Sequence, residues 1–179
     1  MDVAAQVVEF WKEAGPAKWF ARDDAFDAQF RQLFLDEHFA AASRAREHWL
    51  GSAEGALALM LLLDQFPRNC FRGTAHSYAT DGLARHYAMR AIEEGLDLQL
   101  VPKLRAFIYL PFEHSEDPLD QDRSVAMFDV LGDKEYLQYA ELHRDIIRRF
   151  GRFPHRNAVL GRFPTAEELD YLAEGGFAG

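Results

Sequence analysis

Cysteine is almost missing from this sequence. Cys70 is the single cysteine among 179 residues, which excludes an internal disulfide and any zinc or iron–sulfur site that needs several thiolates. One thiol suits a reducing compartment. Asn69 and Phe71 flank it, and no helix N-terminus lies beside it to lower its pKa. We therefore expect Cys70 to be a small packed residue and not a nucleophile.

Long hydrophobic runs are also missing. The longest uninterrupted apolar run, Ala56 to Leu63, falls far short of the ~20 residues that a membrane-spanning helix needs. The first residues include no basic leader, and Glu9 and Lys12 interrupt their apolar run, unlike an export signal. We therefore expect a soluble, cytoplasmic protein with no role at a membrane.

Positive charge is in the minority. Twenty Lys and Arg residues face 29 Asp and Glu residues, for a net charge of −9, which opposes non-specific binding to nucleic acid. The segment from His143 to Arg162 is the exception, because its six arginines and single acid, Asp145, give it +5 and leave −14 for the remainder. This segment predicts either an anion site or a set of ion pairs with the surplus acids.

Common motifs of catalysis and nucleotide binding are absent. The sequence has no Gly-x-Gly-x-x-Gly, no Gly-Lys-Ser/Thr and no Gly-x-Ser-x-Gly. It also lacks the His-x-x-x-His and Glu-x-x-His spacings that place metal ligands on one helix face. We expect no metal site and no cofactor.

The most informative stretch that is present runs from Ser52 to Asn69. Its eight consecutive apolar residues, Ala56 to Leu63, belong to a helix that is apolar all round, and such a helix lies at the centre of a globular domain. Pro67 disfavours the α conformation at Phe66, so we expect this helix to span about 52–65. It would deliver the following polar group to the interior. That group is Asp64-Gln65-Phe66-Pro67-Arg68-Asn69.

The remaining periodicities predict an all-α fold. No segment alternates with the period of a strand, and apolar residues recur at helical spacing. The other expected helices cover about 3–13, 24–43, 81–94, 118–131, 134–150 and 166–173. One more begins near Val101, and Pro111 ends or kinks it. Short connections favour antiparallel helical hairpins, packed as a bundle or a stacked array, in one domain spanning residues 1–179.

Helical spacing also predicts which side chains face the core. In the helix at about 24–43, the inward stripe is Phe26, Phe30, Leu33 and Phe34, and His38 follows it as a packed core residue. In the later helices, Gln121 and His143 occupy the inward faces.

Two further polar strings supply partners for the Asp64–Asn69 group. One is Glu113-His114-Ser115-Glu116-Asp117, and the other is Phe153-Pro154-His155-Arg156-Asn157, which resembles the earlier Phe-Pro string. In one interpretation these residues form a buried acid–arginine network that fixes how the helices meet. In the other they form a ligand site in which arginines bind phosphate or carboxylate and histidines act as acid or base.

The second interpretation defines the candidate residues. The candidates for catalysis are His114, Glu116 and His155. The candidates for ligand binding are Asp64, Arg68, Asn69, Gln121, His143, Arg152, Arg156 and Asn157.

Three strings of the sequence resemble a known family. They are Leu62-Leu63-Asp64-Gln65-Phe66-Pro67-Arg68-Asn69, Leu110-Pro111-Phe112-Glu113-His114-Ser115-Glu116-Asp117 and Arg149-Phe150-Gly151-Arg152-Phe153-Pro154-His155-Arg156-Asn157. On these strings the chain is similar, over nearly its whole length, to the bacterial domain-of-unknown-function family 924. The resemblance implies an all-α fold like that of tetratricopeptide repeats, and it implies no established activity. Cys70 stands where the family pattern leads us to expect an aliphatic residue, and Phe163-Pro164 replaces a more polar segment.

Three functions are compatible with these observations. We expect a helical domain that binds a small anionic ligand or a protein or peptide partner, because repeat-like helical folds usually serve binding. The alternative is an enzyme that acts on a small anionic substrate by histidine-based acid–base catalysis. Nucleic-acid binding through the arginine-rich segment is the weakest of the three, because the total charge opposes it.

Overall fold

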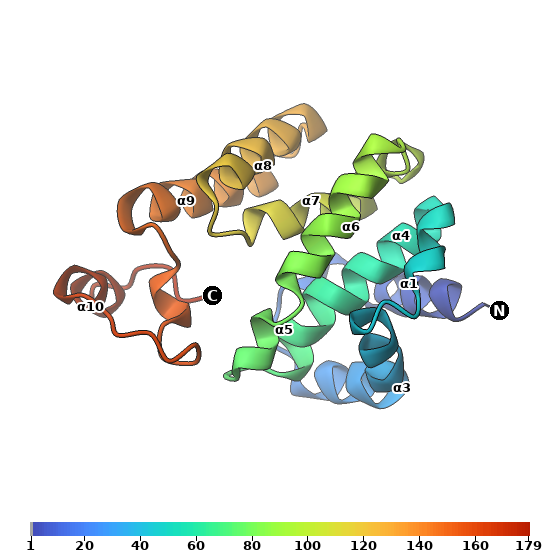
Figure 1. The fold of residues 1–179 in the computed structure, drawn as a ribbon, viewed down its shortest axis with the longest axis horizontal. Coiled ribbons are helices and arrows are strands. Elements are labelled where there is room, and N and C mark those ends of the chain that lie inside the picture. Colours follow the sequence, from blue (N-terminus) through green and yellow to red (C-terminus); the bar gives the residue numbers. More distant parts are fainter. Residues whose placement is uncertain (1) are drawn as a thin grey trace. The chain divides into compact units, whose positions relative to one another are not determined.

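The computed structural model describes residues 2–179, and all the regular structure in them is helical, so the expected all-α class is confirmed. The α-helices are α1 Val3–Ala14, α2 Pro16–Trp19, α3 Asp24–Ala42, α4 Ala53–Met60, α5 Phe66–Cys70, α6 Asp81–Glu93, α7 Pro102–Glu113, α8 Pro118–Leu131, α9 Lys134–Phe150 and α10 Ala166–Ala173 (Figure 1). Short 3₁₀ turns cover Glu47–Gly51, Ala75–Tyr78, Asp97–Gln99 and Pro154–Arg156. Within residues 2–179, no helix is both long and apolar enough to cross a membrane.

The chain forms two compact units. Unit 1 contains the chain up to Arg72 together with His76–Pro111, and unit 2 contains Gly73–Ala75 and Phe112–Gly179. The boundary between the units falls within α7, after Pro111. The candidate residues are therefore divided between the units: Asp64, Arg68 and Asn69 lie in unit 1, and all the others lie in unit 2.

Unit 1 is built around the apolar stretch that the sequence marks as central. Ser52 begins α4 as its N-cap, because its side-chain oxygen accepts the N–H of Gly55 at 3.1 Å. All residues of α4 from Gly55 onward are buried, and the helix packs against α1 and α6 (Figure 1). This confirms the prediction of a helix that is apolar on all sides because neighbours surround it.

The expected end of this helix near Gln65 is wrong. The chain passes from α4 into a π-helical turn, Leu61–Gln65, and continues as α5 to Cys70. Phe66 keeps a helical conformation, with φ −52° and ψ −47°, although proline follows it. The N–H of Phe66 reaches back five residues to the carbonyl of Leu61, so the wider turn accommodates the proline ring that would clash in a regular α-helix.

Side chains of unit 1 satisfy the carbonyls that the π-helical turn leaves open. Pro67 has no N–H, so it cannot donate a backbone hydrogen bond to the carbonyl of Leu62 or of Leu63. The Nδ1 of His38 lies 2.8 Å from the carbonyl oxygen of Leu62. The hydroxyl of Thr80 donates to the carbonyl of Leu63 at 2.5 Å. His38 is therefore the packed core residue that the sequence predicts, and its full burial lowers its pKa.

One inward position predicted in α3 is wrong. Phe26, Phe30 and Phe34 are buried as expected, but Leu33 is 53% exposed. Residues three or four positions apart share one face of a helix, but α3 buries only a narrow stripe of that face. It follows the 26-30-34 row, whose rings contact Phe10 of α1 at centroid distances of 5.1, 5.2 and 5.6 Å.

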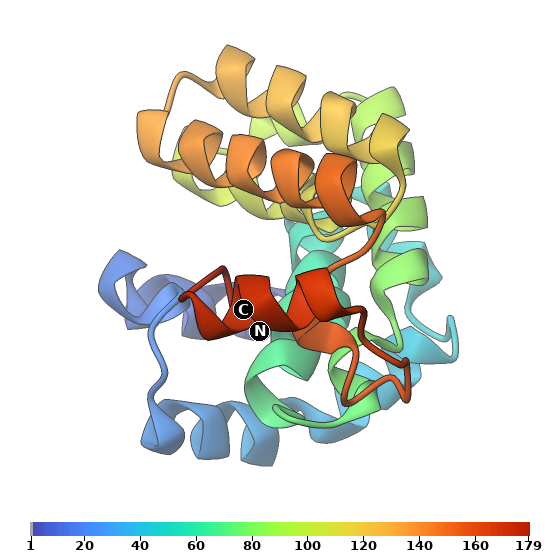
Figure 2. The ribbon, with the colours of Figure 1, turned by 90° about the vertical axis from the view of Figure 1, so that its left-hand side faces the viewer.

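Unit 2 contains a helical hairpin, α8 and α9, followed by α10. Gly132 ends α8 with φ +80°, and Asp133 begins α9 by accepting two backbone N–H groups. The two helices lie side by side (Figure 2). The ring of Phe128 stacks on that of Tyr136 at 5.5 Å, and Asp122 pairs with Arg148 at 2.8 Å, as an antiparallel pairing requires. A capping box of Thr165 and Glu168 begins α10.

Candidate functional site

Asp64 is the first candidate residue of unit 1, and it is completely buried. The side-chain amide of Gln65 donates to its Oδ2 at 2.7 Å, and the Nη1 of Arg68 lies 3.2 Å from its Oδ1. The same Arg68 nitrogen donates to the backbone carbonyl of Asp64 at 2.9 Å. A carboxylate in the interior needs such donors, and the following residues of its own chain segment supply them.

Arg68 is shared between two carboxylates. Its two terminal nitrogens bind the two carboxylate oxygens of Asp81 at 2.8 and 3.0 Å, the side-by-side geometry of a strong arginine–carboxylate pair. Burial by itself lowers the pKa of Arg68, but the carboxylates of Asp64 and Asp81 outweigh it and hold the pKa above its ordinary value. The guanidinium is therefore engaged inside unit 1, between the end of the π-helical turn and the start of α6.

Asn69 joins a second small network in the same unit. Its Nδ2 donates to the Oδ1 of Asp27 at 2.7 Å, and the Nε of Arg72 lies 3.1 Å from the other oxygen of Asp27. Cys70 lies beside this network, and burial raises the pKa of its thiol to about 12. This supports the prediction that Cys70 is a packed residue and not a nucleophile.

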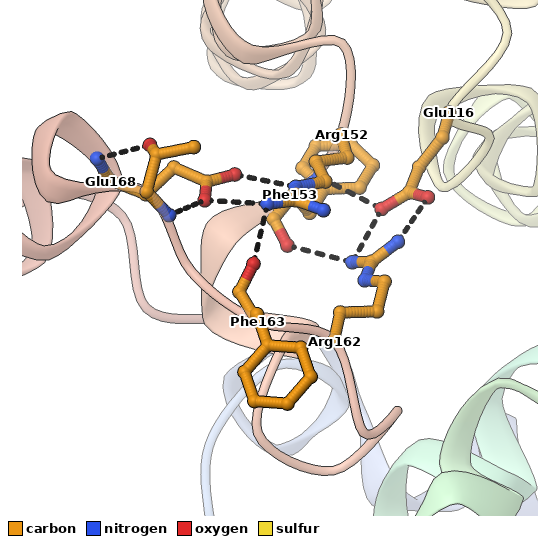
Figure 3. Close-up of polar contacts among 7 residues, drawn as sticks. Glu116, Arg152, Phe153, Arg162, Phe163 and Glu168 are labelled. Carbon is orange, nitrogen blue, oxygen red and sulfur yellow. Dashed lines mark hydrogen bonds and ion pairs between the residues drawn. The ribbon is translucent and has the colours of Figure 1, made fainter.

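The arginines of unit 2 form ion pairs of the same kind (Figure 3). The Nε and Nη2 of Arg152 bind the two carboxylate oxygens of Glu168 at 2.6 and 2.7 Å. The two terminal nitrogens of Arg162 bind those of Glu116 at 2.7 and 3.0 Å, and the N–H of Phe153 donates to Glu116 at 2.8 Å. We call these four charged residues the ion-pair network of unit 2.

The network keeps both of its glutamates ionised. The hydrogen bonds from Arg152 lower the pKa of Glu168 to about 2. Burial by itself raises the pKa of Glu116, but the hydrogen bonds from Arg162 and from the N–H of Phe153 outweigh it and hold the pKa below its ordinary value. A carboxylate that accepts three hydrogen bonds and stays ionised is poorly suited to act as a general acid, so the geometry favours a structural role for Glu116.

The second Phe-Pro string forms a tight turn next to this network. Pro154–Arg156 is a 3₁₀ turn, and both Arg156 and Asn157 are buried, with exposed fractions of 6% and 3%. The guanidinium of Arg156 lies over the ring of Phe153, 4.4 Å from its centroid. Because the planar guanidinium of Arg156 is buried against a ring, its position favours a role in packing.

His143 is the centre of a different group in unit 2. Its side chain is buried, and its Nδ1 lies 2.8 Å from the carbonyl oxygen of Tyr139 and 3.4 Å from the Oε1 of Glu113. Burial lowers the pKa of His143 to about 3. The imidazole is therefore neutral at pH 7 with its proton on Nδ1, and Nε2 is left as a hydrogen-bond acceptor.

Aromatic rings and two more imidazoles surround His143. The ring centroids of His114, Phe153 and Phe177 lie 6.4, 5.4 and 4.6 Å from that of His143. The ring of His155 lies 5.4 Å from Phe177 and 5.7 Å from Phe153. We call His114, His143 and His155, with the neighbouring Glu113, the histidine cluster.

Gln121 supports this cluster from α8. It is fully buried, and its Nε2 donates to the backbone carbonyls of Glu113 and Ser115 at 2.6 and 2.7 Å. Its Oε1 and the hydroxyl oxygen of Ser124, one turn further along α8, are buried and accept no hydrogen bond from residues 2–179. Buried acceptors of this kind are uncommon in native proteins, and these two lie on the helix that faces the end of α7.

Two open hollows of the surface are lined by other residues. One is lined by residues of α3 (Ala28, Arg31, Gln32, Leu33, Leu35, Asp36) and the other by residues of α9 (Lys134, Glu135, Gln138, Tyr139, Leu142). Neither contains a candidate residue. Across residues 2–179, no three His, Cys, Asp or Glu side chains are grouped so that they could hold a metal ion.

The structure thus sorts the candidates by their neighbours. Gln121, His143, His114 and His155 meet in or beside the histidine cluster, whereas Arg152 and Glu116 belong to the ion-pair network. Sequence reasoning left out Glu113 as a site residue, although it stands in the same polar string as His114. It also left out Phe177, for which the only signal is an aromatic residue directly after two glycines.

Comparisons with known proteins agree with the resemblance of the three strings. Among curated proteins, none matches the chain. Among solved structures, the chain is similar to that of a protein of unknown function, ATU0120 from Agrobacterium tumefaciens. The two share 58% sequence identity over 97% of this chain and 98% of that chain, with a TM-score of 0.94. A family model described as a bacterial protein of unknown function matches residues 7–176, so the chain belongs to that family, DUF924.

Proposed function

We propose that this protein is a ligand-binding protein and that the histidine cluster of unit 2 is its binding site. The observation that carries the proposal is the neutral, buried imidazole of His143 beside the carboxylate of Glu113. The ring of His114 neighbours that of His143. The rings of His143 and His155 both contact the ring of Phe177. Buried imidazoles and carboxylates are costly to fold into a protein, and they gather at functional sites more often than elsewhere.

The histidine cluster offers hydrogen-bond acceptors, and these indicate the chemical class of ligand that it would bind. The Nε2 of neutral His143 and the Oε1 of Gln121 can accept hydrogen bonds from a ligand, and the carboxyl group of Glu113 lies 3.4 Å from the Nδ1 of His143. Of the three arginines expected to bind an anion, Arg68 and Arg152 bind carboxylates of the protein, and Arg156 lies over the ring of Phe153. We therefore propose a small ligand that presents hydrogen-bond donors, such as an amine or an alcohol, in place of the anion that the sequence suggested.

The arrangement of helices proposed from the family resemblance fits this function. The α8–α9 hairpin, joined by Gly132 and Asp133, is the kind of unit from which tetratricopeptide-like arrays are built. We propose that the helical hairpins serve as a scaffold that positions side chains for binding. We also propose a cytoplasmic location, because a single thiol needs no oxidising compartment.

Binding can be tested by NMR on the full chain. A library of small amines and alcohols is added to ¹⁵N-labelled protein, and the ring nitrogens of His143 are followed. We expect at least one class to shift His143 while leaving His86, an exposed histidine of α6, unchanged. His143→Phe keeps a ring in place and should abolish binding, which in this variant is followed through the backbone amide shifts. If no compound shifts His143, or if His143→Phe binds equally well, the proposal is wrong.

Acid–base catalysis is the second candidate function, and the contact between Glu113 and His143 favours it. A carboxylate 3.4 Å from the Nδ1 of a histidine can orient the ring, which leaves the Nε2 of the neutral imidazole to accept a proton from a substrate. A broad hydrolase screen of wild type and His143→Gln tests this function. A rate that His143→Gln lowers at least 100-fold would support it, and equal rates would exclude catalysis by His143 in the reactions screened.

A further inference from the structure

The segment after α10 folds back onto unit 2 in a defined way. Gly175 has φ +86°, and its N–H donates to the carbonyl of Leu172 at 3.3 Å. The N–H of Gly176 donates to the carbonyl of Tyr171 at 2.9 Å. These two hydrogen bonds form a Schellman motif, which requires the left-handed conformation that glycine adopts without strain. The direction in which the chain leaves α10 is therefore encoded locally.

The second glycine lets the chain pass close to a tyrosine ring. A Cβ atom at Gly176 would lie 2.5 Å from two ring carbons of Tyr171, closer than real Cβ contacts. The hydroxyl of Tyr171 accepts the N–H of Phe177 at 2.9 Å. Tyr171 thus holds the backbone on both sides of the Gly176–Phe177 peptide bond, and a side chain at position 176 is incompatible with this path.

The path places the ring of Phe177 on the histidine cluster. Its centroid lies 4.6 Å from that of His143 and 5.4 Å from that of His155, in both cases edge to face. Gly179 also lies against the histidine cluster, because a Cβ atom there would be 3.2 Å from the Cδ2 of His155. Phe177 also packs against the small core of Ile146, Ile147 and Phe153, together with Phe150 and Tyr171.

We propose that residues 175–179 are an intramolecular plug, in which Phe177 occupies the position that an aromatic group of a ligand takes in the histidine cluster. This inference rests on the proposed function, and it narrows the ligand to one that carries an aromatic ring together with its hydrogen-bond donors. The plug regulates the site, because the ligand must displace it.

The contacts of the plug are weak enough for a ligand to displace it. Phe177 is only partly buried, and the two residues after it are exposed. The ring of Phe177 and the hydrogen bond from its N–H to Tyr171 hold the segment beyond the Schellman motif. Segments with so few buried contacts open locally at much lower free energy than the rest of a protein. Edge-to-face contacts between imidazole and phenyl rings can be replaced by another ring of similar size.

Two variants of the full chain separate the plug from the site. Gly176→Val blocks the turn against Tyr171, and Phe177→Ala removes the ring. Phe163→Ala is the control, because Phe163 lies in unit 2 and is 93% exposed. The first readout is the titration of His143 by NMR. Its pKa, held to about 3 by burial, should move toward the ordinary value in both variants and stay unchanged in Phe163→Ala.

The second readout is binding of a probe, N-acetyl-phenylalaninamide, which has the ring of Phe177 and amide donors. We expect it to bind Gly176→Val and Phe177→Ala at least 10-fold more tightly than wild type or Phe163→Ala, because no plug competes with it. If the titration of His143 and the affinity for the probe are the same in all four proteins, the plug does not exist.

The outcome also distinguishes the plug from the function on which it rests. If His143 titrates differently in the two variants but no compound of the library or probe binds any protein, the plug covers the cluster and the proposed function fails. If compounds bind wild type and both variants with equal affinity at His143, the proposed function stands and the plug is overturned. A circular-dichroism melt of each variant identifies any that fails to fold. If one variant does not fold, the result for the other variant tests the proposal.

Discussion

Arg152 holds Glu168 with two hydrogen bonds of 2.6 and 2.7 Å, although the two residues lie 16 positions apart. The N–H of Thr165 donates to the same carboxylate at 2.7 Å. One acid therefore completes the cap of α10 and also joins that helix to the residues that follow α9. The contact shows that arginines expected to bind a ligand can serve the fold.

The first prediction concerns this pair. Arg152→Ala leaves Glu168, whose side chain is 2% exposed, without its two hydrogen bonds from arginine. We expect the free energy of unfolding to fall by about 1–3 kcal/mol, because a buried charged acceptor loses its donors. Urea denaturation at pH 7 measures the change.

Arg149→Ala is the matched control. Arg149 pairs with Glu167, the neighbour of Glu168, at a similar distance of 2.8 Å, but both side chains are more than half exposed. We expect a loss below about 0.5 kcal/mol, since exposed pairs contribute little. Equal losses for the two variants would show that the Arg152 pair has no special structural role.

The second prediction concerns the pH dependence of stability. The pKa of Glu168 is about 2 in the folded protein, below its value of 4.5 in the absence of neighbours. A lowered pKa contributes stability above the unfolded value, and this contribution is lost as the pH falls through the folded value. We expect wild type to lose more stability than Glu168→Gln between pH 5 and about pH 2. Urea denaturation at several pH values measures both, and parallel curves would contradict the assignment.

The third prediction concerns anions. The guanidinium groups of Arg68, Arg152 and Arg162 each bind a carboxylate of the protein through two nitrogens. Phosphate would have to displace a carboxylate that is already held in place, so we expect the melting temperature to stay constant across a panel of phosphate and dicarboxylates. Chloride at equal ionic strength is the control for screening. A rise with phosphate that Arg152→Ala abolishes would restore the anion site suggested by the sequence.

The helices could be predicted from the sequence because their signals are local. The capping box of Thr165 and Glu168, the N-cap of Asp117 before Pro118 and the period of α9 each involve residues within a few positions of one another. Such signals also put His143 on the buried face of α9, where the structure has it.

The partners of the polar residues could not be predicted in the same way. Asp27 and Asn69 are 42 positions apart, and Glu116 and Arg162 are 46 apart, so no spacing rule links them. Composition predicted that the arginine-rich segment would either bind an anion or pair with acids. Only the positions of individual oxygen and nitrogen atoms favour pairing.

The π-helical turn was missed for a related reason. A proline in a helix predicts a break when only the backbone is considered. The break is avoided because the side chains of His38 and Thr80, distant in sequence, donate to the carbonyls that the proline leaves open. A rule about local conformation cannot include donors that come from other helices.

The fourth prediction tests this compensation. Thr80→Val removes the hydroxyl that donates to the buried carbonyl of Leu63, and we expect a loss of about 1–3 kcal/mol for the unpaired acceptor. Pro67→Ala restores a backbone N–H that can donate to the same carbonyl in a regular α-helix. In the double variant Thr80→Val should therefore cost less, with a coupling free energy of about 1 kcal/mol in a double-mutant cycle.

The control for this cycle is Ser77→Ala. Ser77 also donates a hydroxyl to a backbone carbonyl of unit 1, that of Phe71, at 2.5 Å. Pro67→Ala supplies no new donor to that carbonyl, so the effects of Ser77→Ala and Pro67→Ala should add within about 0.5 kcal/mol. If both cycles are additive, the carbonyl of Leu63 does not depend on Thr80, and the π-helical turn is stable for another reason. Coupling in the Thr80 cycle alone would show that a side chain from α6's N-cap position replaces the hydrogen bond that Pro67 cannot make.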